Sequence, residues 1–167
     1  MDYRIDEMKA FDWHQVASIY KEGIETGIAT LQPDVPGWEE WDQGHEKSCR
    51  LVARSGERIL GWAALSPTSV REVYAGVVEV SIYVKETCHG QGIGKALLTH
   101  LVKCSEEKGF WTLQAGIMEG NEASVGLHLS CGFRVLGVRE KLGKMPNGIW
   151  HNVIFMERRS RSVGIEK

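Results

Sequence analysis

The residues best suited to chemistry are three glycines, Gly90, Gly92 and Gly94, which lie between a run of alternating apolar residues and a run with helical spacing. Glycine inside a helix lowers its stability by about 1 kcal/mol relative to alanine. We therefore expect these glycines to have a function that offsets this loss. The first N–H groups of a helix are unpaired and carry partial positive charge, and glycine removes the side chains that would keep a phosphate away. The cluster therefore indicates an anion site that fits a pyrophosphate. The alternative is a strand-to-helix connection that needs glycine only for its backbone angles.

Two common phosphate-binding motifs do not match this cluster. The phosphate loop of nucleotide hydrolases needs a glycine five residues before its Gly-Lys pair and a Ser or Thr after it, but those positions hold His89 and Ala96. A dinucleotide fingerprint that began at the first or second glycine would need another glycine at Lys95 or Leu97. The sequence therefore excludes both motifs.

One acid, Glu79, interrupts the apolar strand expected over residues 77–84. Alternation places it on the face opposite Val78 and Val80. Partial burial would raise the pKa of this carboxyl group toward the range in which a general base works at neutral pH. The alternative is a solvated or ion-paired glutamate, the usual state of a single acid on a strand.

The elements that must position these residues can be read from the hydrophobic periodicity. We expect strands over residues 3–8, 50–54, 58–65, 77–84, 111–117, 133–138 and 149–156, and helices over 13–26, 93–108 and 122–130. Residues 27–44 indicate a loop that leads into a short helix. Asp12 and Asn121 are expected to cap the first and last of the longer helices. Helices alternating with strands, together with an N-terminal hairpin, predict an α/β (α+β) fold whose mixed, mostly antiparallel sheet carries helices on both faces.

The size and charge of the chain limit its organisation and partners. Its 167 residues, 43% of them hydrophobic, are enough for one sizeable core. We expect a single domain over residues 1–157 and a polar tail over residues 158–167. The formal net charge of −2 gives no reason to expect binding to nucleic acid or to an anionic membrane surface.

Neither a membrane span nor a metal site is indicated. The longest apolar runs are far shorter than a bilayer span, and the N-terminus MDYRIDEMKAFDW lacks a basic start followed by an apolar core. We therefore expect a cytoplasmic protein. The four cysteines are scattered without a Cys-x-x-Cys pair, so no metal and no disulfide framework are expected.

Residues 89–94 read HGQGIG and resemble Arg/Gln-x-x-Gly-x-Gly/Ala, the acetyl-CoA pyrophosphate loop of the GNAT superfamily of N-acetyltransferases. His89 stands where that family usually has Arg or Gln. Four further stretches resemble its phosphinothricin N-acetyltransferase branch, which includes relatives that act on methionine sulfoximine; they read IYKEGIETGIATLQPD, WAALSPTSVREVYAGVVEVSIYV, GNEASVGLHLSCGF and GIWHNVIFMER. The resemblance covers nearly the entire chain.

The resemblance implies the GNAT fold and acetyl-CoA as co-substrate. The backbone of Ile82, Tyr83 and Val84 would pair with the pantetheine arm, because the two central strands of the GNAT fold separate at this point. Asn121 and Ser124 would lie beside the arm. The residues around the pyrophosphate would be His89, Gly90, Gln91, Gly92, Ile93, Gly94 and Lys95.

The resemblance implies proton-transfer roles for two residues. Glu79 matches the region where this branch carries its proposed base, which would deprotonate the acceptor amine. His128 lies four residues before Gly132, where many GNAT enzymes have a Tyr that protonates the CoA thiolate. It could equally cap or pack against the cofactor arm, and without the resemblance it would be a histidine on a helix surface.

The same resemblance implies which residues would bind the acceptor, the molecule whose amine is acetylated. An amino-acid acceptor presents a carboxylate or a phosphinate, which calls for a cation and hydroxyl groups in the pocket. Arg71 and Tyr74 match the Arg-x-x-Tyr of the family, and Thr30 lies in the matching N-terminal loop. The Gly-x-Trp-x-Asp segment of the family appears here with Asn152 in place of the acid.

The resemblance thus implies an N-acetyltransferase that moves the acetyl group of acetyl-CoA to the amine of a small amino acid or analogue, by direct attack in a ternary complex. One alternative is a protein or peptide N-acetyltransferase. Another is a CoA-binding module without turnover. Because exposed final strands in this fold often pair subunits, a homodimer is also expected.

Overall fold

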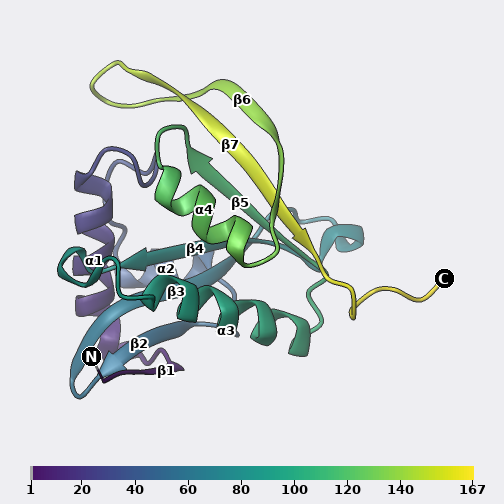
Figure 1. Ribbon diagram of the computed structural model, residues 1–167, viewed down its shortest axis with the longest axis horizontal. Helices are drawn as coiled ribbons and strands as arrows, with labels where there is room; N and C mark the ends of the chain where they lie inside the picture. Colours follow the sequence, from purple (N-terminus) through teal and green to yellow (C-terminus); the bar gives the residue numbers. More distant parts are fainter. Residues whose placement is uncertain (1) are drawn as a thin grey trace.

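The computed structural model describes residues 2–167, which form a mixed sheet with helices on both faces (Figure 1). Its strands are β1 (Arg4–Glu7), β2 (Leu51–Ser55), β3 (Arg58–Pro67), β4 (Val77–Val84), β5 (Thr112–Met118), β6 (Arg134–Lys144) and β7 (Trp150–Arg159). Its helices are α1 (Trp13–Glu25), α2 (Trp38–Gly44), α3 (Ile93–Glu107) and α4 (Glu122–Ser130). The strands lie in the order β1-β2-β3-β4-β5-β7-β6, antiparallel throughout except for β4 and β5. The expected single-domain fold is confirmed.

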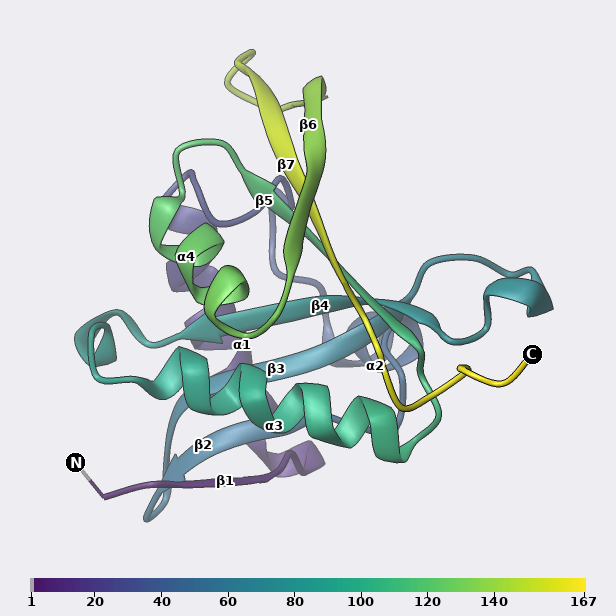
Figure 2. The same cartoon turned by 45° about the vertical axis from the view of Figure 1, so that its right-hand side comes forward.

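Helices cover the two faces of the sheet, with α3 in front of β2–β4 and α1 and α2 behind them (Figure 2). The apolar side of α3 joins a buried cluster that includes Val78 of β4. On the other face, Ile19 of α1, Trp41 of α2 and Trp62 of β3 form a second buried cluster, against which Tyr83 packs. Even-numbered and odd-numbered residues of β4 therefore face different helices, as the alternation in the sequence predicts.

β4 and β5 separate part way along their length (Figure 2). Parallel pairing joins residues 77–79 to residues 112–114, and within the described chain no pair follows Glu79 and Gln114. Beyond this point β4 stays paired with β3 as far as Val84, while β5 stays paired with β7. The separation leaves an opening in the middle of the sheet, with α4 beside it.

The last two strands are longer than the periodicity predicts. β6 and β7 reach residues 144 and 159, although the sequence indicated ends at 138 and 156. Most side chains of β6 are exposed, so burial imposes no clear alternation on them. β7 also includes Arg158 and Arg159, the first residues of the expected tail, and Ser160 is buried with its hydroxyl donating to Glu106 of α3.

The expected cap at Asp12 is wrong. Asp12 lies in a short 3-10 turn (Ala10–Asp12), and its side chain makes no capping hydrogen bond to α1. Its carboxylate instead accepts two hydrogen bonds from the Arg54 guanidinium, at 2.9 and 2.8 Å. It also accepts from the N–H of Lys9 at 2.9 Å, so its oxygens are occupied by donors that lie outside α1. Asn121 does cap α4, where its side chain accepts from the N–H of Ser124 at 3.3 Å.

The part of the chain that the structure describes contains neither a membrane-spanning helix nor a metal-binding cluster. No helix in residues 2–167 is long and apolar enough to cross a membrane. No group of His, Cys, Asp and Glu in that range could hold a metal ion, and all four cysteines are free thiols. The cytoplasmic location stays a prediction.

Candidate active site

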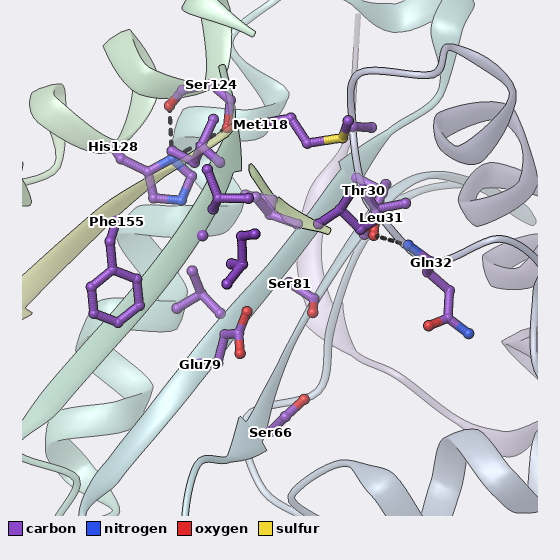
Figure 3. A pocket seen from close by; sticks show the side chains of 18 of the residues that line it. Thr30, Leu31, Gln32, Ser66, Glu79, Ser81, Met118, Ser124, His128 and Phe155 are labelled. Atoms are coloured by element: carbon purple, nitrogen blue, oxygen red, sulfur yellow. Dashed lines mark hydrogen bonds between the residues drawn. The ribbon is translucent and has the colours of Figure 1, made fainter. Parts of the chain in front are cut away.

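A cavity of about 460 Å³ lies at the opening between β4 and β5 (Figure 3). Strands β3–β7, helices α1 and α4 and the loop that follows α1 all contribute to its wall. Its polar side chains come from Tyr20, Thr30, Gln32, His45, Ser66, Glu79, Ser81, Tyr83, Ser124, His128 and Arg139. The volume falls in the range of small-molecule sites.

Glu79 lies at the point where the pairing of β4 and β5 ends, and its side chain faces the cavity. The cavity wall shields the carboxyl group from solvent and so raises its pKa, although the residue keeps an exposed surface, and no charged or hydrogen-bonding neighbour in residues 2–167 lowers it. Gly116 of the neighbouring strand lies beside the carboxylate, since a Cβ atom there would be 3.9 Å from Oε1, an ordinary contact distance. A carboxylate without a partner and with a raised pKa suits a general base.

His128 reaches the cavity from α4, and its side chain is 2% exposed. Its Nδ1 donates to the carbonyl oxygen of Ser124 at 2.7 Å, because a carbonyl can only accept. The other ring nitrogen, Nε2, is buried in the wall of the cavity and has no partner among the described residues (Figure 3). Burial lowers the pKa of His128, so the ring is held neutral with a lone pair on Nε2.

The rings of Tyr20, Tyr83 and His45 line the side of the cavity nearest α1 and α2. The sequence did not indicate that these rings belong to the site. The ring of Tyr83 lies 4.8 Å from that of Tyr20, and burial raises the pKa of both phenols, so both stay protonated. His45 stacks on Trp41 at 4.1 Å and donates from Nδ1 to the Trp41 carbonyl at 2.7 Å. Burial lowers the pKa of His45, helped by the charge of Arg50. No local pattern marks these rings, because they come from separate segments.

The glycine-rich loop leads from β4 into α3. Gly90 and Gly92 have φ angles of +77° and +79°, which L-residues with side chains rarely adopt, and a Cβ atom on either would meet nothing within 4 Å. In the first intrahelical bond of α3, Ala96 donates to the Gly92 carbonyl. The N–H groups of Ile93, Gly94 and Lys95 therefore precede the helical ladder and have no intrahelical partner at a positive helix end. This geometry fits a pyrophosphate.

His89 has a structural task in this loop. Its Nε2 donates to the carbonyl oxygen of Val84 at 2.9 Å, which ties the loop to the end of β4. The imidazole is thus turned back toward the strand. Gln91 and Lys95 are exposed, so their side chains are free to approach an anion at the start of α3.

Beyond Glu79, successive residues of β4 direct their backbone N–H and C=O groups alternately toward β3 and toward the opening. Lys85 N–H donates to the Leu60 carbonyl, and antiparallel pairing alternates from there, so Tyr83 directs its backbone groups toward β3. Ile82 and Val84 direct theirs toward the opening. Of the three residues expected to pair with the pantetheine arm, Ile82 and Val84 therefore have the required direction, and Tyr83 instead contributes its ring to the cavity.

Asn121 and Ser124 hold the start of α4 beside the opening. The Asn121 amide donates to the Ile28 carbonyl at 3.3 Å while its oxygen caps the helix. Ser124 lines the cavity and orients His128 through its carbonyl. The cap therefore ties α4 to the loop that also carries Thr30.

The three residues expected to bind the acceptor are not brought together. Thr30 lines the cavity, where its hydroxyl accepts from the N–H of Gln32 at 3.0 Å. Arg71 and Tyr74 do not line it; they lie on the exposed loop between β3 and β4, with the guanidinium 5.4 Å from the ring centre. The cation in the cavity wall is instead Arg139 of β6, which the sequence did not indicate because the expected strand ended at residue 138.

A sequence profile of the Acetyltransferase (GNAT) family matches residues 12–133. The chain is 34% identical over 163 residues to the L-methionine sulfoximine/L-methionine sulfone acetyltransferase of Pseudomonas paraeruginosa. The aligned region covers 94% of each chain. It is also 31% identical over 153 residues to the phosphinothricin N-acetyltransferase of Streptomyces viridochromogenes. That alignment covers 89% of this chain and 83% of the relative.

The fold agrees with these matches. The phosphinothricin acetyltransferase of Sinorhizobium meliloti, solved in complex with acetyl-CoA, superposes with a TM-score of 0.87 and 29% identity, covering 100% of this chain and 93% of that one. The family profile spans most of the chain, and both relatives extend over more than four-fifths of it. The chain therefore belongs to the GNAT family of acetyltransferases and is an acetyl-CoA-dependent N-acetyltransferase.

Proposed function

We propose that the acceptor is the amine of a small amino acid or analogue, of the phosphinothricin or methionine sulfoximine type, and that it attacks acetyl-CoA directly in a ternary complex. The observation that carries this proposal is Glu79, a carboxylate with a raised pKa and no partner among residues 2–167, in a cavity of about 460 Å³. The names of the relatives support the same class of acceptor.

The proton balance of the reaction gives Glu79 its task. An amino acid is mostly an ammonium ion at neutral pH, so its nitrogen must lose one proton before it has a lone pair. Glu79 accepts this proton, directly or through a water molecule, and passes it to solvent. The nitrogen then bonds to the acetyl carbon, the carbon–sulfur bond breaks, and a second proton from the nitrogen ends on the sulfur.

His128 transfers the second proton in this proposal. Its Nε2 has a lone pair and no partner in the cavity wall, so a small movement of the ring would let it accept a proton from the nitrogen and return it to the sulfur. This differs from the role expected from the sequence, in which the histidine starts as a donor. A ring that starts protonated is disfavoured because burial lowers its pKa.

Acetyl-CoA supplies an activated acyl group, and the chain offers it a continuous surface. The start of α3, with Gly90, Gln91, Gly92, Ile93, Gly94 and Lys95, would hold the pyrophosphate. The free backbone groups of Ile82 and Val84 would pair with the pantetheine amides. Ser124 and Asn121 of the α4 start would lie beside the arm.

A thiol-release assay with acetyl-CoA tests the proposal. The acceptors should include phosphinothricin, L-methionine sulfoximine, L-methionine sulfone, ordinary amino acids and peptides with free N-termini. Release with free amino acids or their analogues is the expected result. Activity restricted to peptides would replace the proposal with the peptide alternative, and tight CoA binding without thiol release on any amine would indicate a module without turnover.

We also propose that two copies of the chain associate. Apolar side chains are exposed on β6, on the turn that follows it and at the start of β7, namely Val135, Leu136, Val138, Ile149 and Trp150. β6 is also an edge strand, with one side of its backbone unpaired in the sheet. Light scattering on the purified protein should give twice the mass of the chain, and Val138→Glu should lower that mass; a wild-type monomer would contradict the proposal.

A further inference from the structure

Arg139 is the sole lysine or arginine in the wall of the cavity within residues 2–167. Its side chain is exposed and forms no ion pair or hydrogen bond with the described residues. Glu79 is the sole acid in the same wall. The cavity therefore presents one unpaired cation and one unpaired carboxylate, a charge pattern complementary to a molecule that carries both an amine and an anionic group.

Arg139 lies at the last regular pair before an irregularity of β6. It pairs with Val153 of β7, which also lines the cavity, so the two side chains share a face of the sheet. Residues 140–142 then stand opposite the single residue Asn152, since Gly143 pairs with His151. In a regular strand, residues 139 and 142 would face opposite sides, but the bulge lets Leu142 line the cavity as well.

Asn152 stabilises the bulge. Its side-chain oxygen accepts from the N–H of Lys141 at 2.8 Å, where the backbone has a φ of +43°. Its amide nitrogen donates to Glu119 at 3.4 Å. An aspartate could accept from Lys141 but could not donate to Glu119, and it would repel that carboxylate. The asparagine that replaces the family's acid thus suits the bulge that follows Arg139.

Arg139 also lies in a continuous row of cavity residues. Val153 pairs with Arg139 on one side and with Met118 of β5 on the other, and all three line the cavity. Leu31 of the loop that follows α1 packs closely on the backbone of the bulge, since a Cβ atom at Gly143 would come within 2.5 Å of its side chain. The strand pairing therefore sets the face of the sheet from which the Arg139 side chain extends, while its exposed guanidinium stays free to meet a ligand.

The charges of Arg139 and Glu79 stand apart. Burial raises the pKa of Glu79, and Arg139 does not counteract this effect, as a cation in direct contact would. Both residues line the same cavity, so an acceptor bound there would lie against both of them. Its ammonium group can then reach the carboxylate while its anionic group reaches the guanidinium.

We propose that Arg139 holds the anionic group of the acceptor and so determines which amines are acetylated. This inference rests on the proposed function of the cavity. Guanidinium binds carboxylate, phosphinate and similar oxyanions through paired hydrogen bonds, so the ligand chemistry is an oxyanion borne by the acceptor. Arg71, the cation expected from the sequence, lies outside the cavity wall and is not needed for this contact.

The test compares wild type with Arg139→Gln and Arg139→Lys in steady-state kinetics. Arg139→Gln should raise the KM for the best acceptor by about 10- to 100-fold, the loss of a charged hydrogen-bond pair, with kcat and the KM for acetyl-CoA nearly unchanged. Arg139→Lys should recover part of the loss. Arg134→Gln is the matched control, since Arg134 lies on the same strand, is exposed and pairs with Glu157 at 2.7 Å.

Two further acceptors identify the oxyanion. One is the α-carboxamide of the best acceptor, and the other is an analogue with an uncharged side chain. The oxyanion bound by Arg139 is the one whose removal makes wild type and Arg139→Gln equal. If both compounds still respond to Arg139→Gln as the parent does, Arg139 holds no acceptor anion and the proposal is overturned.

The outcomes also separate this inference from the proposed function. Wild-type activity on amino acids together with an unchanged KM in Arg139→Gln would overturn the role of Arg139 and leave the function standing. No activity of the wild type on any small amine would overturn the function itself. Thermal unfolding of each variant shows whether it is folded, and an exposed side chain without partners is expected to leave the melting temperature unchanged.

Discussion

Glu79 and His128 line one cavity from β4 and α4, and burial moves their pKa values in opposite directions. Both shifts have the same cause, since a poorly solvated environment favours the uncharged form of either group. The carboxylate becomes a stronger base and the imidazole stays neutral. Each group can then accept a proton near neutral pH, which fits a reaction in which the acceptor nitrogen gives up two protons.

Replacing Glu79 tests the first proton transfer. Glu79→Gln should lower kcat by about 10²- to 10⁴-fold, the usual contribution of a general base, with little change in the KM for acetyl-CoA. In the wild type the base works only when ionised, so kcat/KM should rise as the pH rises through the elevated pKa of Glu79. The variant should lack this rising limb in its pH–rate profile.

A matched control for this variant is Glu57→Gln, in the turn between β2 and β3 and outside the cavity wall. It should keep the wild-type profile. If Glu79→Gln retains both its rate and the rising limb, another group removes the proton. His45 would then be the next candidate, because it lines the same cavity and its pKa is lowered.

Replacing His128 tests the second transfer. His128→Phe keeps a ring against Phe133, whose centre lies 5.0 Å away, but removes the lone pair of Nε2. We expect kcat to fall by about 10- to 100-fold, with both KM values nearly unchanged. A higher KM for acetyl-CoA at unchanged kcat would mean instead that the ring only packs against the cofactor arm.

The backbone features of the proposed cofactor side are largely predictable from sequence, because backbone conformation selects residue types locally. Gly90 and Gly92 occur where φ is positive, and a glycine cluster is visible without knowledge of the rest of the fold. Asn121 occurs at a helix start, where a short side chain with an oxygen atom satisfies a free N–H. Such signals lie within a few residues of the feature that they predict.

The acceptor side is not predictable in this way. Thr30, His45 and Arg139 come from three distant segments, and the cavity that joins them exists only after the sheet has opened. Arg139 also depends on a bulge that no short pattern marks. Arg71 fits the family pattern as well as any residue, yet its guanidinium lies near the ring of Tyr74 on an exposed loop. Side-chain direction, rather than residue type, decides these assignments.

The glycine-rich loop can be tested by a substitution that adds one methyl group. Gly92→Ala should raise the KM for acetyl-CoA about tenfold, because the methyl group would crowd an anion at the start of α3 and the φ of +79° would be strained. Gly56→Ala is the matched control. Its φ is +61° and its surroundings are also open, but it lies in the turn between β2 and β3.

Both glycine variants should lose about 1 kcal/mol of stability from strain in the left-handed region. The KM for acetyl-CoA should change in Gly92→Ala alone. Equal KM values in the two variants would show that the glycine serves the backbone only, which is the alternative left open by the sequence. Steady-state kinetics together with urea unfolding measure both quantities.

Asp12 provides a prediction about stability rather than activity. Its side chain is 2% exposed and binds Arg54 through two hydrogen bonds of 2.9 and 2.8 Å, and the guanidinium also reaches Asp6 at 2.9 Å. Asp12→Ala would leave a buried guanidinium with half of its partners, and we expect a loss of about 3 kcal/mol in the free energy of unfolding. Urea unfolding at neutral pH measures it.

The same ion pair should make stability depend on pH. Burial tends to raise the pKa of Asp12, but the hydrogen bonds from Arg54 and from the N–H of Lys9 outweigh this effect, and the pKa is lowered in the folded protein. The stabilisation is therefore complete above about pH 4, the pKa of an unfolded aspartate, and is lost as the pH falls through the lower folded-state value. The difference in unfolding free energy between wild type and Asp12→Ala should shrink over that acidic range; a difference that stayed constant there would show that Asp12 stabilises the fold by packing rather than by charge.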